Sequence, residues 1–286
     1  MIYILISVIC SVSVGILFKL ANRYSINIQQ AITSNYLAAI LLCTWLLKPK
    51  PELTNLPNSP VYFVLGALLP IIFWILSKSV KTVGIARTDI AQRLSLVIPL
   101  IAAYFIFGEV FSPAKALALV VAIAAVMLIL SGKSAGSTQK MTAYPALVFL
   151  GFGTVDILFK QLAADKSTPY TTSLVIVFCI AFMLSLLASM YRFFKEKKSF
   201  KLASILFGLL LGIFNFSNIF FYLKAHQALA KQPSVVFASM NIGVVVLGSL
   251  VGLFVFRERL SRLNKLGIAL AIVSIIIITV VQYNGN

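Results

Sequence analysis

Two pairs of oppositely charged side chains fall inside long apolar stretches of the chain. Asp89 and Arg93 are four residues apart, and Asp156 and Lys160 repeat that spacing with the acid again first. Residues four apart are neighbours on a helix, so each pair can form an intrahelical ion pair. Charged groups are costly in lipid and commonly mark a solute or proton pathway. The spacing therefore predicts solute binding at these residues, with either acid able to relay a proton, whereas a purely structural ion pair is the alternative.

A short sequence repeat places a lysine in the same local setting at two positions in the chain. The sequences SVGILFK (13–19) and TVDILFK (154–160) align Lys19 with Lys160, and Gly15 stands where Asp156 would be. A lysine in this setting can hold a solute carboxylate, or it can extend to the membrane surface along its own alkyl chain. We interpret the repeat as a duplication that kept the cation and varied the acid.

Other polar side chains share the apolar runs. Asn215, Asn218 and Tyr222 fall at spacings of three and four, on one stripe of a helix. Such a stripe should face the protein interior, because an amide facing lipid is unsatisfied. Hydrogen bonds between helices, without a ligand, are the alternative. The predicted solute-binding set is Lys19, Asn35, Trp74, Lys78, Asp89, Arg93, Asp156, Lys160, Asn215, Asn218, Tyr222 and Asn241.

The sequence contains no motif for a metal or cofactor site. The cysteines Cys10, Cys43 and Cys179 fall in apolar runs without a CxxC spacing, so neither a disulfide framework nor a metal site is expected. The sole histidine, His226, lies near a predicted helix end and is interpreted as an interfacial residue. P-loop and Rossmann fingerprints are absent, and the seven acids are scattered. We expect no cofactor and no enzymatic activity.

The composition places these residues in a bilayer. Hydrophobic residues make up 60% of the 286, and charged residues only 11%; a soluble domain is roughly half apolar and a quarter charged. The net charge of +17 would suggest nucleic acid in a soluble protein. Here the Lys and Arg residues mostly lie between apolar runs, where they can face anionic lipid headgroups. We therefore expect a membrane protein that does not bind nucleic acid.

Spanning helices must position the polar groups, and each needs about 20 mostly apolar residues. We predict an all-α integral membrane protein in which ten transmembrane helices form two inverted five-helix repeats. The repeats are residues 1–131 and 141–286, joined by a linker at 132–140. Five helices per repeat make the second repeat enter the membrane from the opposite face. The predicted helices are approximately 2–22, 28–47, 61–80, 86–107, 113–131, 142–164, 170–191, 202–224, 233–256 and 263–282.

A second local repeat and two pairs of glycines add to this prediction. YFIFGEVFS (104–112) matches LFVFRERLS (253–261), which places Glu109 and Glu258 just before the last helix of each repeat. There a carboxylate complements the positive end of the helix dipole. Pairs of glycines four apart, at 208 and 212 and at 248 and 252, predict closely packed helices.

Two long segments carry a family resemblance: GIARTDIAQRLSLVIPLIAAYFIFGE (84–109) and QPSVVFASMNIGVVVLGSLVGLFVFRE (232–258). Together with two five-helix repeats, they resemble the drug/metabolite transporter superfamily, and the EamA-like branch most of all. The resemblance implies a multi-pass carrier of the plasma (inner) membrane that moves small solutes, often outward, by alternating access. It also implies cytoplasmic termini, whereas the loops after helices one, three, five, seven and nine hold most of the basic residues, and this charge pattern places the termini outside.

Lysines and arginines outnumber acids in the predicted set. This balance predicts an anionic or zwitterionic solute, such as an amino acid. We expect a monomer or a homodimer, in which Asp89 or Asp156 can couple transport to protons. The alternatives are an exporter of cationic drugs, an intramembrane enzyme and a non-transporting scaffold.

Overall fold

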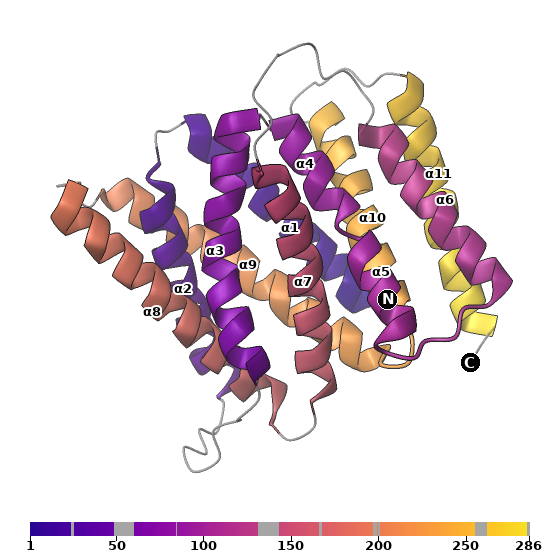
Figure 1. Ribbon diagram of the computed structural model, residues 1–286, viewed down its shortest axis with the longest axis horizontal. Coiled ribbons are helices and arrows are strands. Elements are labelled where there is room, and N and C mark those ends of the chain that lie inside the picture. The colour runs from indigo at the N-terminus through magenta and orange to yellow at the C-terminus, as the bar shows by residue number, and fades with distance from the viewer. Residues whose placement is uncertain are drawn as a thin grey trace.

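The computed structural model of this chain is a bundle of eleven helices, and no strand occurs in the residues it describes (Figure 1). Those residues are 1–23, 26–48, 60–83, 85–130, 143–165, 168–196, 199, 201–254 and 262–284. The helices are α1 (Ile2–Arg23), α2 (Ile28–Leu47), α3 (Pro60–Val83), α4 (Ile85–Leu94), α5 (Val97–Phe105), α6 (Pro113–Leu130), α7 (Tyr144–Ala164), α8 (Tyr170–Glu196), α9 (Leu202–Ala228), α10 (Pro233–Phe254) and α11 (Arg262–Asn284).

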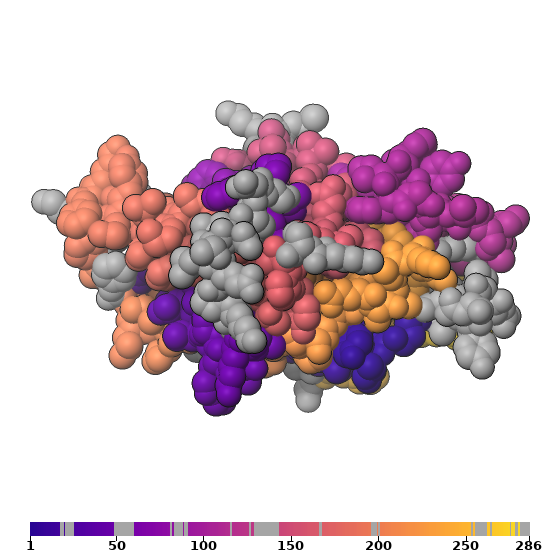
Figure 2. All heavy atoms as spheres, turned by 90° about the horizontal axis from the view of Figure 1, so that it is seen from below, coloured from indigo at the N-terminus to yellow at the C-terminus, as the bar shows by residue number. Residues whose placement is uncertain are grey.

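Within the described ranges, six of these helices, namely α2, α3, α7, α8, α9 and α10, are long and apolar enough to cross a membrane. The protein is therefore an all-α membrane protein, which confirms the predicted class. Viewed from below, the bundle is longer than it is deep, with α8 toward one end and α6 toward the other (Figure 2).

The run predicted as one helix over 86–107 is divided into α4 and α5. Pro99 has no N–H to donate to the carbonyl of Ser95, which is where the helix is interrupted. The backbone tightens instead: Ile98 donates to the Ser95 carbonyl at 3.0 Å, and Leu96 donates to the Arg93 carbonyl at 3.3 Å. The break ends α4 in the middle of the bundle.

Helix α9 crosses α2 at two glycines. A Cβ at Gly208 would strike the Ala31 carbonyl, and one at Gly212 would meet Ala38 at 2.6 Å. The close packing predicted for this glycine pair is confirmed. Gly248 differs, because a Cβ there would meet nothing within 4 Å, so the close contact predicted at that position is wrong.

Contacts between the early and late helices come in reciprocal pairs. Helix α2 packs on α9, and α3 packs on α8. In the same way, α1 contacts α9 while α3 contacts α7, and α1 contacts α10 while α7 contacts α4 and α5. The last helices of the two halves, α6 and α11, pack against each other, with the Ser274 hydroxyl donating to the Ala118 carbonyl at 2.8 Å (Figure 1). The space between these interleaved helices holds the candidate site.

Candidate functional site

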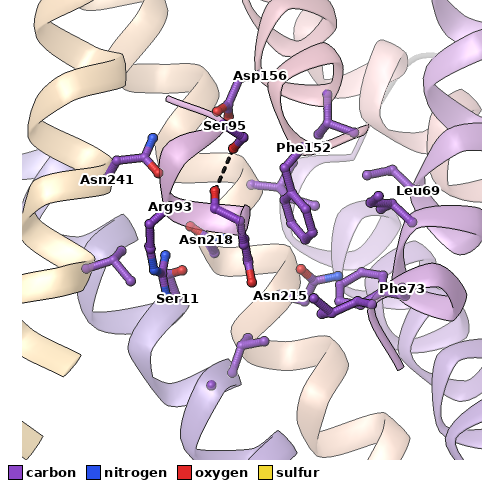
Figure 3. A pocket seen from close by; sticks show the side chains of 18 of the residues that line it. Ser11, Leu69, Phe73, Arg93, Ser95, Phe152, Asp156, Asn215, Asn218 and Asn241 are labelled. Atoms are coloured by element: carbon purple, nitrogen blue, oxygen red, sulfur yellow. Dashed lines mark hydrogen bonds between the residues drawn. The ribbon is translucent and has the colours of Figure 1, made fainter. Parts of the chain in front are cut away.

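A cavity of about 310 Å³ opens between α1, α3, α4, α7, α9 and α10. We call it the central cavity. Apolar and aromatic side chains form much of its wall, including Leu69, Phe73 and Phe152 (Figure 3). Its polar lining consists of Ser11, Ser77, Thr88, Gln92, Arg93, Ser95, Asp156, Asn215, Asn218, Tyr222 and Asn241. An apolar pocket with a few converging polar groups is the usual form of a small-molecule site.

Asp156 supplies the acid of the central cavity. It lies on α7, and the Tyr222 hydroxyl of α9 donates to its Oδ1 at 2.8 Å. Asn241, from α10, also lines the cavity, and its Nδ2 donates to the Phe237 carbonyl at 3.1 Å. Tyr222 is only 5% exposed, so its hydroxyl is held in place by the surrounding helices. The hydrogen bond between α9 and α7 thus fixes the carboxylate at the cavity wall.

Arg93 supplies the base. It belongs to the last turn of α4, immediately before the break at Ser95 and Leu96. The Ser95 hydroxyl donates to the Gln92 carbonyl at 2.6 Å, drawn as the dashed line in Figure 3, and so stabilises this helix end. Figure 3 shows the Arg93 side chain beside Ser11 and apart from Asp156. Arg93 thus joins the cavity wall from the last turn of α4, directly before the helix break.

Two amides of α9 complete the polar wall. Asn218 accepts a hydrogen bond from the Ser7 hydroxyl at its Oδ1, at 2.7 Å. Asn215 is 4% exposed, and among the described residues its Nδ2 has no hydrogen-bond partner. An unmatched buried amide costs about 1–3 kcal/mol. A donor kept at that cost in a cavity wall fits a site whose partner is a ligand.

Other predicted residues lie elsewhere. Trp74 and Lys78 line a second hollow of about 470 Å³, which we call the vestibule, and the Lys78 ammonium lies 5.6 Å from the Trp74 ring. Ile28 and Ser77 line both the vestibule and the central cavity, so the two spaces adjoin. These two predicted residues therefore stand outside the central cavity and beside its opening.

Two more predicted residues are buried away from both spaces. Asn35 is 1% exposed and packs with its backbone against Gly212. Lys160 does not extend to the surface: it is 3% exposed and donates to the Ala230 carbonyl at 2.8 Å. The side chains of Lys19 and Asp89 lie outside the part of the chain that the structure describes.

His226 and Glu109 differ from expectation. The interfacial position predicted for His226 is wrong, because the ring is fully buried between Tyr222, at 4.6 Å between centroids, and Phe237, at 4.8 Å. Glu109 accepts hydrogen bonds from the Ser234 N–H at 2.8 Å and from its hydroxyl at 2.7 Å. It therefore caps α10 of the other half, whereas the prediction assigned it to the helix that follows it.

The sequence analysis missed Ser11, Ser77 and Thr88, because hydroxyl side chains are ordinary in apolar helices and carry no signal alone. A signal exists in the spacing of the lining residues. Many of them recur in the second half 141, 146 or 149 residues later in the chain, and the first and last of these offsets are those of the two local repeats. The pairs are Ser11 and Phe152, Val14 and Val155, Gly15 and Asp156, Leu69 and Asn215, Ile72 and Asn218, Phe73 and Ile219, Leu76 and Tyr222, Gln92 and Asn241, and Ser95 and Val244.

A helical membrane protein with a polar cavity between helices from both halves of the chain has the architecture of a solute carrier. The chain belongs to the EamA-like transporter family, whose model matches residues 1–131. It is a multi-pass membrane transporter of the drug/metabolite type, as the resemblance predicted.

Two relatives extend the match over nearly the whole chain. A protein of Haemophilus influenzae (strain ATCC 51907 / DSM 11121 / KW20 / Rd), described as an uncharacterized protein, is 39% identical in an alignment of length 283 that covers 95% of this chain and 95% of its own. A protein of known crystal structure has a TM-score of 0.72 at 13% identity, covering 98% of this chain and 96% of its own. The second likeness concerns the fold alone.

Proposed function

We propose that the protein exports a small zwitterionic solute, such as an amino acid, across the plasma (inner) membrane by alternating access. One observation carries this proposal: Arg93 and Asp156 line the same cavity. A guanidinium can bind a carboxylate through two parallel hydrogen bonds. A carboxylate, in turn, can bind an ammonium group. A cavity of about 310 Å³ is at the small end of ligand sites, which favours a metabolite of amino-acid size.

The structure refines the charge argument made from sequence. Of the four basic residues in the predicted set, only Arg93 lines the central cavity among the described side chains, and it is balanced by Asp156. Equal and opposite charges favour a zwitterion over a plain anion. The amides of Asn215 and Asn218 provide further hydrogen-bonding groups that can orient it.

Alternating access in this proposal comes from two inverted five-helix repeats, 1–131 and 141–286, with a linker at 132–140. The paired lining positions and the reciprocal helix contacts support a duplication of this kind. In transporters built from inverted repeats, the solute site lies where the repeats meet, and one repeat moves against the other. The carrier acts as a monomer or homodimer, and no catalysed reaction or cofactor enters the proposal.

Outward transport is supported by the position of the vestibule. It lies beside the connections after α1, α3 and α8, on the side where basic loop residues are concentrated. The positive-inside rule assigns that side to the cytoplasm. On the opposite side of the bundle, Lys160 of α7 donates to the Ala230 carbonyl just after α9, and Glu109, after α5, accepts from Ser234 of α10. These contacts tie the helices together. A cavity adjoining a cytoplasmic vestibule is arranged to load solute for export.

The test is transport in proteoliposomes with a panel of radiolabelled amino acids. We expect flux of at least one zwitterionic amino acid, and loss of that flux in Arg93→Gln. Arg93→Lys keeps the charge without the planar fork and should retain part of the activity. Transport restricted to hydrophobic cations contradicts the proposal.

An exporter of cationic compounds is the second candidate. Phe73, Phe152 and Phe159 line the central cavity together with Asp156, and aromatic faces with a carboxylate suit a bulky organic cation. The two functions separate at Arg93. Export of a cation should survive Arg93→Gln, whereas export of a zwitterion should not.

A further inference from the structure

The vestibule carries an unusual concentration of positive charge. Its basic side chains come from three helices: Lys78 from α3, Arg192 from α8 and Lys201 from the start of α9. No acidic residue occurs among the described residues that line it. The hollow has about 470 Å³ of space, enough to hold more than a hydrated surface ion.

A hydrogen-bonded frame holds these cations around the hollow. The Gln30 side chain donates to the Ser199 carbonyl at 2.9 Å and accepts from the Lys201 N–H at 3.0 Å. The N–H of Asn27, which caps α2, donates to the Ser204 hydroxyl at 2.9 Å. These bonds lock the start of α2 to the start of α9, so the base of the vestibule is a fixed structure and Lys201 is held at its edge.

Polar groups beside the cations complete the lining. Ser77 and Ser199 bring hydroxyl groups, and Gln29 brings an amide that donates to the Ser185 carbonyl at 3.2 Å. Oxyanions are bound most strongly where charged donors and hydroxyl groups converge in a confined space. Because Ser77 also lines the central cavity, an anion held in the vestibule lies on the route to the solute site.

We infer that the vestibule is an oxyanion-binding site, separate from the central cavity, which takes a carboxylate or phosphate group on Lys78, Arg192 and Lys201. The oxyanion has two sources: the anionic end of the solute on its way to the cavity, or the phosphate of a lipid headgroup. The first source rests on the proposed function, whereas the second does not. Confined positive charge also raises the local concentration of anionic ligands.

The first experiment uses inorganic phosphate as the probe. The melting temperature of the detergent-purified full chain is measured against phosphate concentration at constant ionic strength, because a ligand bound to the folded state raises it. We expect the apparent dissociation constant for phosphate to rise about tenfold in Lys78→Gln and in Lys201→Gln. Lys78→Arg, which keeps the charge, should bind nearly as the parent does.

Two controls separate this site from its surroundings. Lys195→Gln removes an equal charge from α8, one turn from Arg192, at an exposed lysine that contacts Tyr191 and does not line the vestibule. Arg93→Gln removes the base of the central cavity. Both controls should keep the phosphate response. If Lys195→Gln weakens it equally, general surface charge is responsible; if Arg93→Gln abolishes it, the anion binds in the central cavity. Either result overturns the inference, as does a parent protein that does not respond.

The second experiment identifies the source. Native mass spectrometry follows the protein after extraction from vesicles of phosphatidylglycerol and phosphatidylcholine. If the vestibule binds a lipid headgroup, one phosphatidylglycerol molecule should stay bound to the parent protein and to Lys195→Gln. It should be lost from the double variant Lys78→Gln/Lys201→Gln. If the vestibule binds the anionic end of the solute instead, no variant should retain a lipid. The phosphate response described above should still be observed. Failure of amino-acid transport would leave both readouts intact, so it tests the proposed function alone.

Discussion

Two helices from different halves of the molecule, α3 and α9, present opposite chemistry at matching positions of the central cavity. Where α9 places Asn215, Asn218 and Tyr222, α3 places Leu69, Ile72 and Leu76. Asp156 on α7 likewise corresponds to Gly15 on α1. Matching positions thus give a polar stripe on α9 and an apolar stripe on α3. Under the proposed function, α9 offers hydrogen-bonding groups to the solute and α3 offers an apolar surface. The pattern is reversed at Ser11 and Ser95 of the early half, which match Phe152 and Val244 of the late half.

Arg93 is the basic residue that the early half adds to the cavity wall. The early half contributes this base from α4, which ends at the break imposed by Pro99, whereas the matching α10 runs unbroken from Pro233 to Phe254. The two charges that we assign to the solute therefore come from different halves. A solute that bridges them stabilises one arrangement of the halves over another, as coupling of binding to movement requires.

The largest expected effect comes from the acid. Asp156→Asn should lower flux about 100-fold, because the ammonium partner is lost within a low-dielectric cavity. The matching change in the early half, Gly15→Ala, should leave flux within about twofold, since a Cβ there meets nothing within 4 Å. Initial transport rates in proteoliposomes measure both. Thr154→Ala, on the exposed side of α7, controls for expression and helix stability; equal losses in all three variants contradict the comparison.

Substitution of alanine at two glycines, Gly208 and Gly248, should change the stability of the fold to very different extents. Gly208→Ala forces a methyl group onto the Ala31 carbonyl and should destabilise the fold by about 3 kcal/mol. Gly248→Ala has open space and replaces a poor helix former, so its melting temperature should be unchanged or slightly higher. Thermal melting in detergent compares the two, and similar melting temperatures would show that α2 and α9 are not in close contact.

Loss of the hydrogen bond from Tyr222 of α9 to Asp156 of α7 should affect transport less than loss of the acid itself. Tyr222→Phe removes the hydroxyl that donates to Asp156 at 2.8 Å and should raise the half-saturating solute concentration about tenfold. Tyr191→Phe, on the exposed face of α8, is the matched control and should change nothing. A change confined to the maximal rate, without loss of apparent affinity, would argue against a role in holding the carboxylate.

The smallest expected effect comes from the helix break. Pro99→Ala restores an N–H that can bond the Ser95 carbonyl, which favours a continuous helix and displaces Arg93. Flux should fall about threefold. Dipolar spectroscopy between labels on α4 and α5 should show a longer separation of the two helices in the variant; an unchanged separation with reduced flux would locate the effect elsewhere.

The sequence alone predicted the class of fold and the family, and its predicted set contains six of the eleven polar residues that line the central cavity. Asn215, Asn218 and Tyr222 could be predicted because polar residues on one helical stripe of a membrane protein must face inward. Lys160 could not be placed, because its partner is the Ala230 carbonyl, brought near by a tertiary contact that no local spacing records. The ten-helix inverted topology stays a prediction, supported by the paired lining positions.

His226 shows more clearly what the local sequence cannot predict. Its position near a helix end indicated an interfacial residue, yet α10 folds back and covers it with Phe237. The break at Pro99 was equally hidden, since a proline inside a membrane helix is often tolerated, as Pro70 is within α3. In both cases the outcome depends on neighbouring helices rather than on the local sequence.

Competition by charge-matched analogues tests the central claim most directly. For an amino acid that the protein carries, its methyl ester keeps the ammonium alone and its N-acetyl derivative keeps the carboxylate alone. If Arg93 and Asp156 bind opposite ends of one zwitterion, each analogue should compete at least about tenfold more weakly than the parent amino acid. In Arg93→Gln the methyl ester should compete as well as the amino acid. A methyl ester or hydrophobic cation that outcompetes the amino acid in the unaltered protein would contradict the account.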